Sequence, residues 1–284
     1  MENNLDQFYT KTEVALSLTK KLNAYNLANY TFLEPSAGTG SFINALNFIF
    51  KEPKIIAVDI EPKSSCIIKK DFLEFETKHK NIFTIGNPPF GKRASLAIKF
   101  FNHASNFSNY IAFILPLQFQ KWSVQKHLNK DFKLILDETL EPNSFIFNGK
   151  EYSVRCCFQI WTKLESKIDL RIKEAPPTKH KDFEMWQYNN TKETIKYFDK
   201  SKYKWDFAVA RQGYYDYKNF IYDENKLNPK VQYIFFKANN NNTLEKLKNI
   251  DFEKLSKKNT TIPGFGKADV VKEFLSININ KNEI

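Results

Sequence analysis

The sequence predicts an α/β fold with a mostly parallel sheet, an antiparallel hairpin at the sheet edge and a smaller C-terminal region. Short apolar runs bounded by Gly, Pro or polar residues recur through the first half, at residues 30–34, 55–60, 82–86 and 110–115. Segments with helical spacing alternate with them or follow them, at residues 42–50, 95–107 and 122–129. This alternation is typical of βαβ units, and near-continuous apolar runs fit strands that are buried on both faces.

Two further apolar runs, 132–140 and 152–161, are joined by a short segment that contains Asn148-Gly149. Asn-Gly is a strong signal for a tight hairpin turn. We therefore expect these runs to form an antiparallel pair at the edge of the sheet.

The chain changes character after Trp161. Residues 163–183 are charged and include Pro176-Pro177, which is typical of a crossing segment. We therefore expect a first domain over 1–165 and a second over 166–284. The end of the chain is more basic than the beginning, because residues 162–284 carry 24 Lys and Arg against 17 Asp and Glu.

Charge and cysteine content restrict the class of protein. The formal net charge is +11 over 284 residues, which fits a partner with phosphates or an acidic surface but also fits a solvated, lysine-rich surface. The three cysteines Cys66, Cys156 and Cys157 give neither a disulfide framework nor metal-ligand spacing, so we expect no metal. The polar N-terminus and the lack of an 18-residue apolar stretch predict a cytoplasmic protein without a membrane partner.

A glycine loop follows the first predicted strand, in the segment EPSAGTGSF at residues 34–42. Gly38 and Gly40 allow a sharp turn close to a ligand, and the helix that follows offers free N–H groups. Asp59 ends the next strand about 20 residues after the loop, where a carboxylate binds a ribose. The loop, the helix and the carboxylate together predict a nucleotide-type cofactor.

The class of cofactor follows from what the loop lacks. It has no third glycine at the dinucleotide spacing and no Gly-Lys-Ser/Thr, so the phosphates of NAD or ATP have no binding site. S-adenosylmethionine (SAM) contains adenosine without phosphate, and Glu34 supplies an acidic group for its cationic end. Asp71 and Phe72 are candidates for binding the adenine, although an acidic residue that opens a polar turn explains them equally well.

The predicted strand 82–86 runs into Asn87-Pro88-Pro89-Phe90, where two prolines fix the backbone and leave carbonyl groups at the ligand-binding edge. An exocyclic amine of a nucleobase is a poor nucleophile, because its lone pair is delocalised into the ring. If the Asn87 side-chain oxygen and the Pro88 carbonyl accepted its two N–H groups, the lone pair would point at a sulfonium methyl. Phe90 would stack on the base, which must be flipped out of its helix.

The two motifs in this order, preceded by Phe8-Tyr9-Thr10, resemble the class I SAM-dependent N6-adenine methyltransferases, in the motif order of the gamma group of DNA methyltransferases. The resemblance covers roughly residues 5–161 and implies a Rossmann-like methyltransferase fold, SAM as cofactor and DNA as partner, as in restriction-modification. It implies catalytic roles for Asn87, Pro88, Pro89 and Phe90. The cofactor-binding residues that it implies are Phe8, Tyr9, Thr10, Glu34, Pro35, Ser36, Gly38, Gly40, Phe42, Asp59, Ile60, Asp71, Phe72 and Asn87.

Several alternatives stay open beside this resemblance. RNA is the alternative partner, because the tetrapeptide treats adenine alike in either polymer. A catalytically silent partner subunit that binds nucleic acid is the alternative outside the enzymes. Enzymes that methylate the glutamine amide share the motif but usually carry Tyr where this chain has Phe90. A cytosine-C5 methyltransferase would need a cysteine after proline, whereas Cys156 and Cys157 follow Arg155.

Residues 166–284 are expected to supply target recognition, because sequence reading needs side chains outside the catalytic sheet. Arg211, Gln212 and Tyr214 are of the types that read base edges or stack on bases, and a surface turn explains them equally well. Lys267 follows a Gly-rich turn that would bind a phosphate or simply start a helix. The sequence also leaves a homodimer open.

Overall fold

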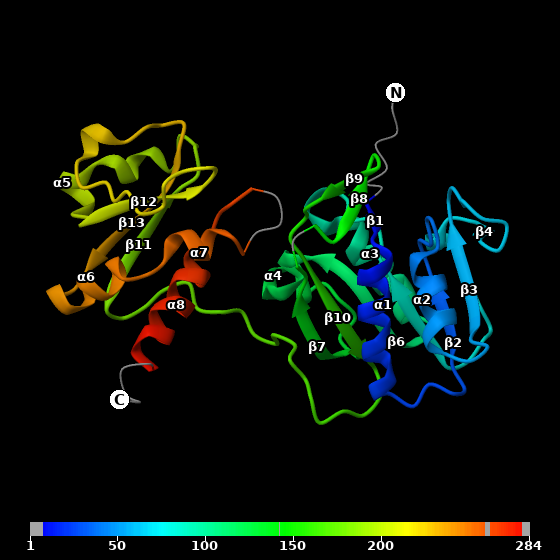
Figure 1. The fold of residues 1–284 in the computed structure, drawn as a ribbon. Helices are drawn as coiled ribbons and strands as arrows, with labels where there is room; N and C mark the ends of the chain where they lie inside the picture. The colour runs from blue at the N-terminus through cyan, green and yellow to red at the C-terminus, as the bar shows by residue number, and fades with distance from the viewer. Residues whose placement is uncertain (1–7, 142, 259–261, 280–284) are drawn as a thin grey trace. The chain divides into compact units, whose positions relative to one another are not determined.

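The computed structural model describes residues 8–141, 143–258 and 262–279. It divides the chain into two compact units, Met1–Lys173 and Glu174–Ile284 (Figure 1). The first unit contains the predicted parallel sheet, and the second contains a small antiparallel sheet with helices.

A seven-stranded sheet with the order β4-β3-β2-β5-β6-β10-β7 forms the first unit. Its strands are β4 (Ile68–Lys69), β3 (Lys54–Asp59), β2 (Thr31–Glu34), β5 (Ile82–Gly86), β6 (Ser108–Pro116), β10 (Cys156–Thr162) and β7 (Lys133–Thr139). Strand β10 runs antiparallel to both of its neighbours, and the other strand pairs are parallel. The predicted α/β class with a mostly parallel sheet is confirmed.

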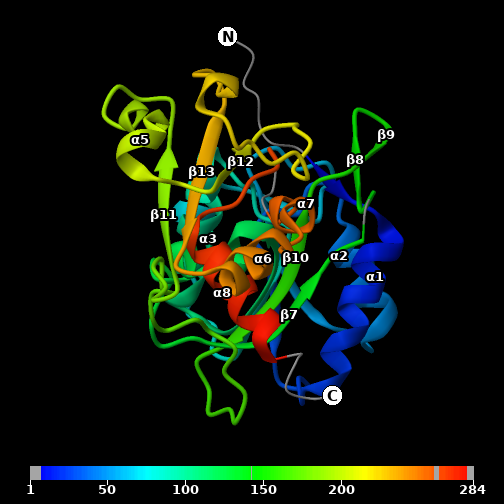
Figure 2. The same cartoon turned by 90° about the vertical axis from the view of Figure 1, so that its left-hand side faces the viewer.

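Helices cover both faces of this sheet because each has one apolar stripe. One face is packed by α1 (Thr12–Lys20) and α2 (Ser41–Ile49), and α2 buries Phe42, Ala45 and Leu46 at i, i+3 and i+4. The opposite face is packed by α3 (Ser95–Ser105) and α4 (Trp122–Gln125). Figure 2 shows α1 and α2 on one side of the sheet and α3 on the other.

Short 3-10 helices connect several of these elements. In the first unit they are η1 (Lys21–Ala24), η2 (Phe72–Glu74), η3 (Lys92–Ala94) and η4 (Leu117–Gln120). The helical pattern expected over 122–129 ends as an α-helix at Gln125, because the His127 and Leu128 N–H groups bond carbonyls three residues back.

The antiparallel part of the sheet differs from its prediction. Strands β7 and β10 do pair, but the Asn148-Gly149 turn belongs to a separate hairpin of β8 (Phe145–Phe147) and β9 (Lys150–Tyr152). Strand β8 also pairs with β1 (Tyr9–Thr10) to form a three-stranded sheet. Asn148 and Gly149 have φ of +50° and +72°, which this tight turn requires.

The division between the units lies beyond the expected residue 165, because the following segment packs onto the first unit. The Leu170 N–H donates to the Leu134 carbonyl at 2.7 Å. Arg171 donates from its guanidinium to the carbonyls of Gln125, Leu128, Asn129 and Phe132, at 2.6–2.9 Å. These bonds satisfy carbonyl groups at the end of α4 and in the turn after it.

The second unit is built on the antiparallel sheet β11-β13-β12, whose strands are Phe183–Tyr188, Gln232–Ala238 and Phe207–Gln212. Alternate side chains of each strand enter apolar clusters on opposite faces. One face is packed by α6 (Asn241–Lys248), α7 (Phe252–Ser256) and α8 (Lys267–Ile279). The other is packed by η5 (Ile195–Phe198) and α5 (Lys200–Tyr203), and η6 (Glu224–Lys226) lies before β13.

Candidate active site

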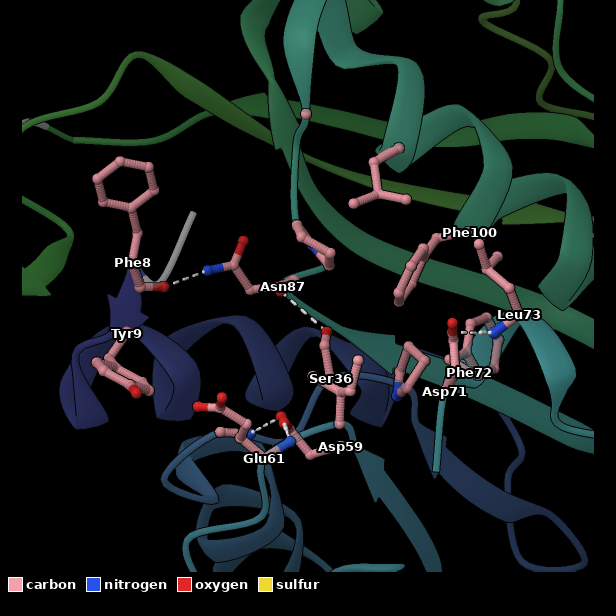
Figure 3. A pocket seen from close by; sticks show the side chains of 16 residues that line it. Phe8, Tyr9, Ser36, Asp59, Glu61, Asp71, Phe72, Leu73, Asn87 and Phe100 are labelled. Carbon is pink, nitrogen blue, oxygen red and sulfur yellow. Dashed lines mark hydrogen bonds between the residues drawn. The ribbon is translucent and has the colours of Figure 1, made fainter. Parts of the chain in front are cut away.

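A cavity of about 340 Å³ opens at the carboxyl ends of β2, β3 and β5 in the first unit (Figure 3). This is the edge of an open α/β sheet at which ligands bind, and the volume is in the range of small-molecule sites. The lining residues are Phe8, Tyr9, Pro35, Ser36, Gly38, Asp59, Ile60, Glu61, Asp71, Phe72, Leu73, Asn87, Pro89, Gly91, Leu96 and Phe100.

The glycine loop is fixed to the end of β3 by Asp59. One carboxylate oxygen of Asp59 accepts from the Gly38 N–H at 2.7 Å, and the other accepts from the Glu61 N–H at 2.8 Å. Gly38 has φ of +52°, which favours glycine, and a Cβ built there would lie 3.1 Å from the Tyr9 ring and press against it. Asp59 lines the cavity, and each of its oxygens has a second lone pair that these bonds do not use.

Asp71 opens η2 at the far end of the cavity. Its carboxylate accepts from the Leu73 N–H at 2.9 Å, so Asp71 does open a polar turn, as one of the two interpretations expected. Asp71, Phe72 and Leu73 nevertheless all line the cavity, with Phe100 of α3 opposite them (Figure 3). The side chains near Asp71 therefore form an apolar compartment with one acidic group.

Asn87 lies where β5 ends, with its side chain held in one orientation. Its Nδ2 donates to the Phe8 carbonyl at 2.9 Å, and its own backbone carbonyl accepts from the Ser36 hydroxyl at 3.0 Å. The Oδ1 atom is buried and has no hydrogen-bond partner among the described residues. An unpaired buried acceptor costs free energy, so a ligand donor that reached this oxygen would form a stabilising hydrogen bond.

Glu34 is a second acceptor without a donor. It is 2% exposed at the end of β2, and its Oε2 atom has no partner among the residues that the structure describes. Burial raises the pKa of the Glu34 carboxyl well above its ordinary range, and the nearby Asp59 adds to this, while a bond from the Ile43 N–H opposes it. A cationic group placed beside Glu34 would favour the carboxylate form.

The remaining predicted residues fall into two groups. Thr10, Glu34 and Phe42 line a small adjoining cavity of about 30 Å³, together with Phe8, Tyr9 and Asn87. Gly40, Pro88 and Phe90 line neither cavity. Phe90, the expected stacking residue, is 8% exposed and packs in the apolar cluster of the α1–α2 face, with its ring centroid 6.4 Å from that of Phe8.

Five lining residues were not expected from the sequence: Glu61, Leu73, Gly91, Leu96 and Phe100. Glu61 and Leu73 each lie two residues after an expected acidic residue, and this proximity is the one signal that could have found them. Leu96 and Phe100 are four residues apart on α3, a spacing that sequence patterns assign to the core.

The two buried cysteines agree with the exclusion of a cysteine nucleophile. Cys156 and Cys157 are fully buried in β10, and burial raises the pKa of both thiols. A thiol in such surroundings is inert.

Of the four candidate residues of the second unit, Arg211 and Lys267 form hydrogen bonds inside that unit. The Arg211 guanidinium donates to Asn189, to Gln232 and to the Phe265 carbonyl. Gln212 ends β12, and Tyr214 is 82% exposed in the turn after it. Lys267 donates to the Met185 carbonyl at 2.8 Å, and the Asp269 carboxylate accepts from the Gly266 N–H, so the expected phosphate position at the start of α8 already holds an acidic group.

Within ranges 8–141, 143–258 and 262–279, no group of three or more His, Cys, Asp and Glu side chains could hold a metal ion. No helix in that part of the chain has the length and apolar character needed to cross a membrane.

The glycine loop after β2, the single antiparallel strand β10 of the seven-stranded sheet and the cavity at the strand ends define a Rossmann-like α/β fold. A segment of 95 residues is 33% identical to the Type II methyltransferase M.CvrRI of Paramecium bursaria Chlorella virus XZ-6E. The expected resemblance to a DNA methyltransferase is confirmed over this segment. The match covers 30% of this chain and 24% of that protein, so the chain spans about a quarter of its relative. No protein-family model matches the chain.

Solved structures of low identity also resemble the chain. The type IIG restriction endonuclease BpuSI matches with a TM-score of 0.44 and 12% identity, over 66% of this chain and 27% of its own. The 23S rRNA methyltransferase ErmE matches with a TM-score of 0.41 and 14% identity, over 56% and 73%. TrmN from Thermus thermophilus matches with a TM-score of 0.40 and 16% identity, over 54% and 49%. Likeness at this level says nothing about the substrate.

Proposed function

We propose that the protein transfers a methyl group from SAM to the exocyclic N6 amine of adenine in DNA. The observation that carries the proposal is the buried Oδ1 of Asn87, an acceptor without a donor at the end of β5. The hydrogen bond from Nδ2 to the Phe8 carbonyl assigns the amide orientation and leaves Oδ1 as the atom that can accept a donor. An exocyclic amine is the donor group that fits this position.

The cofactor assignment is supported by the acceptors that the cavity offers. SAM carries an ammonium and a sulfonium, and the unpartnered oxygen of Glu34 is a fitting acceptor for such a cationic end. Asp59 would accept the ribose hydroxyls, and Asp71 the adenine amine, beside the apolar walls at Phe72 and Phe100. When bound, SAM supplies an electrophilic methyl group on sulfur.

The residues of this chain would act by orienting the acceptor amine. Asn87 Oδ1 would accept one N–H of the amine, and the Pro88 carbonyl, which lines neither cavity in this structure, is proposed to accept the second. Both acceptors withdraw the lone pair from the ring and aim it, so that the reaction depends on proximity and alignment more than on a strong base. Phe8 places an aromatic ring on the cavity wall beside Asn87, where a flat base would find an apolar surface.

DNA is proposed as partner on the basis of charge and of the curated relative. The formal net charge of +11 supports binding to phosphates. The name of the relative, a Type II methyltransferase, supports a restriction-modification setting. The second unit is proposed to take part in recognising the target, with the exposed Tyr214 as a candidate contact.

The test is transfer of labelled methyl groups from SAM to matched duplex DNA, single-stranded DNA, RNA and a protein extract, with the product nucleoside identified by mass spectrometry. We expect N6-methyladenine in DNA. If the label enters only RNA or protein, the proposed substrate is wrong. If no acceptor is labelled, the proposal that the protein is a methyltransferase is wrong.

Asn87→Ala, compared with Asn47→Ala on the exposed side of α2, tests the mechanism. We expect Asn87→Ala to keep the fold by circular dichroism and to bind SAM by calorimetry, but to lose at least 100-fold in turnover, roughly the effect of removing one oriented polar group from a catalytic site. Full turnover in this variant would remove Asn87 from the mechanism, whatever the substrate.

A further inference from the structure

Arginine is rare in this chain, and three of its four arginines have interaction partners in the structure. Only four of the 43 basic residues are Arg. Arg171 donates to four backbone carbonyls, Arg211 donates to three acceptors, and Arg155 also has an interaction partner. Arg93 is different: it is exposed, and no hydrogen bond or ion pair joins its side chain to the described residues.

Arg93 lies in a strained loop directly after the Asn-Pro-Pro-Phe segment. Gly91, Arg93 and Ala94 have φ of +67°, +54° and +62°. Positive φ is costly for residues with a Cβ, and two such residues in succession persist only where the surroundings hold them. Strain of this kind is concentrated at ligand-binding sites, which makes the loop a candidate for a functional role.

The contacts of the loop explain how the strain is maintained. The Phe90 carbonyl accepts from the N–H groups of Leu96 and Ala97 at 3.2 and 3.3 Å, so the segment doubles back and satisfies the first turn of α3. Ala94 is 1% exposed and is anchored in the apolar core on the α3 face. The buried Ala94 and the bonds to the Phe90 carbonyl therefore constrain the backbone of Arg93 from both sides.

Arg93 lies in a loop whose two ends reach the cavity wall. Gly91, two residues before it, and Leu96, three residues after it, both line the cavity wall. A nucleotide flipped into the cavity keeps its link to the strand, so phosphates on either side of it must lie at the cavity mouth. A guanidinium matches a phosphate better than an ammonium does, because its planar fork donates two parallel hydrogen bonds.

We propose that Arg93 binds a backbone phosphate of the DNA strand that supplies the target base, next to the flipped nucleotide. The inference rests on the proposed function and adds a residue that positions the substrate. Arg93 would hold the phosphodiester while Asn87 orients the amine, so that the base enters the cavity in one register.

The test compares Arg93→Ala and Arg93→Lys with Lys99→Ala, which removes an exposed charge from α3 and leaves the loop intact. Binding of a duplex oligonucleotide containing adenine is followed by fluorescence anisotropy over a range of NaCl concentrations. Methyl transfer to the same duplex gives kcat and KM. Arg93→Gly is the second variant, because glycine removes the side chain and accepts the positive φ without strain.

We expect Arg93→Ala and Arg93→Gly to weaken DNA binding about tenfold, as for the loss of one charged contact. The slope of log K against log salt should become shallower by about 0.9, the value for one phosphate contact. SAM affinity should not change, and Arg93→Lys should recover part of the binding.

The two proposals fail in different ways. If the wild type methylates DNA while Arg93→Ala and Arg93→Gly keep its KM and its salt slope, the phosphate contact is wrong and the proposed function stands. If the wild type transfers no methyl group to DNA, the proposed function fails, and with it the role of Arg93. Equal losses in Lys99→Ala would show a general charge effect and would also overturn the contact.

Discussion

The side chain of Asn87 is held by the carbonyl of Phe8 at 2.9 Å, although 79 residues separate the two in the chain. Phe8 is held in turn by the β8–β9 hairpin, because its ring stacks on Tyr152 with a centroid distance of 5.2 Å and an interplanar angle of 7°. The orientation of Asn87 therefore depends on a hairpin that does not itself belong to the seven-stranded sheet.

Weakening this hairpin is expected to lower turnover without unfolding the protein. Gly149 has φ of +72° in the hairpin turn and no neighbour within 4 Å, so Gly149→Ala strains the backbone by about 1 kcal/mol without a clash. We expect kcat to fall several-fold and the melting temperature to stay within about 3 °C. Lys150→Ala, at the next residue, is the control. An unchanged kcat in Gly149→Ala would break the proposed link between hairpin and Asn87.

Asp59→Ala is expected to weaken both the glycine loop and SAM binding. The substitution leaves the Gly38 and Glu61 N–H groups without their acceptors and removes the proposed ribose contact. Because hydrogen bonds to a charged acceptor are lost, we expect the binding free energy of SAM to weaken by about 2 kcal/mol. Calorimetry measures this directly, and an unchanged affinity would refute the ribose assignment.

Glu34→Gln is expected to stabilise the protein at high pH. Because burial raises the pKa of this carboxyl, the folded chain keeps a proton that the unfolded chain releases. The stability that this bound proton contributes is fully present below the ordinary Glu pKa. It is lost as the pH rises through the raised pKa of the folded protein. Calorimetric scans should show a higher melting temperature for Glu34→Gln at about pH 8 and no difference at about pH 4. The exposed Glu74→Gln should change neither, and a lower melting temperature at pH 8 would contradict the burial cost.

The same variant is expected to bind SAM more weakly. A cationic ligand favours the Glu34 carboxylate, so binding to the wild type should release a proton and tighten as the pH rises through the raised pKa. Calorimetry in buffers of different ionisation enthalpy measures this proton. Equal proton release by wild type and Glu34→Gln would exclude Glu34 as the group that ionises.

Arg171→Ala is expected to lower the free energy of unfolding of the first unit by about 2–4 kcal/mol, because four carbonyl groups lose a charged donor. Lys173→Ala removes only an exposed ion pair with Asp169 and should cost less than about 1 kcal/mol. For the same reason a fragment that ends at residue 173 should be more stable to urea than one that ends at residue 165. Equal stability of the two fragments would refute this role for the segment.

The parallel part of the fold could be predicted because its signals are local. Each of the four predicted parallel strands lies within a few residues of an observed one, and the glycine loop and Asp59 fall at the strand ends that the pattern requires. The role of Asn148-Gly149 could not be predicted in the same way. Its turn signal is local, but the partner of its hairpin is β1, far away in the sequence.

The parts of the site that sequence could not supply depend on tertiary contacts. Leu96 and Phe100 line the cavity from a helix whose apolar face looks like ordinary core. Lys267 matched a phosphate-binding pattern, yet its ammonium is bound to the Met185 carbonyl, which lies 82 residues earlier. In the sequence Arg93 is only one of four arginines, and what distinguishes it from the others is a backbone conformation and the lack of a partner among the described residues.

The pairing of β1 with β8 also has a consequence for biosynthesis. Thr10 lies opposite Phe145, so the strand that carries Phe8 and Tyr9 to the cavity waits for a partner more than 130 residues later. At ribosomal speeds of about 5–20 residues per second, this delay is roughly 7–30 seconds. The glycine loop and Asp59 emerge early, while the wall that orients Asn87 closes only after the hairpin has been translated, so the nascent chain acquires its complete pocket late.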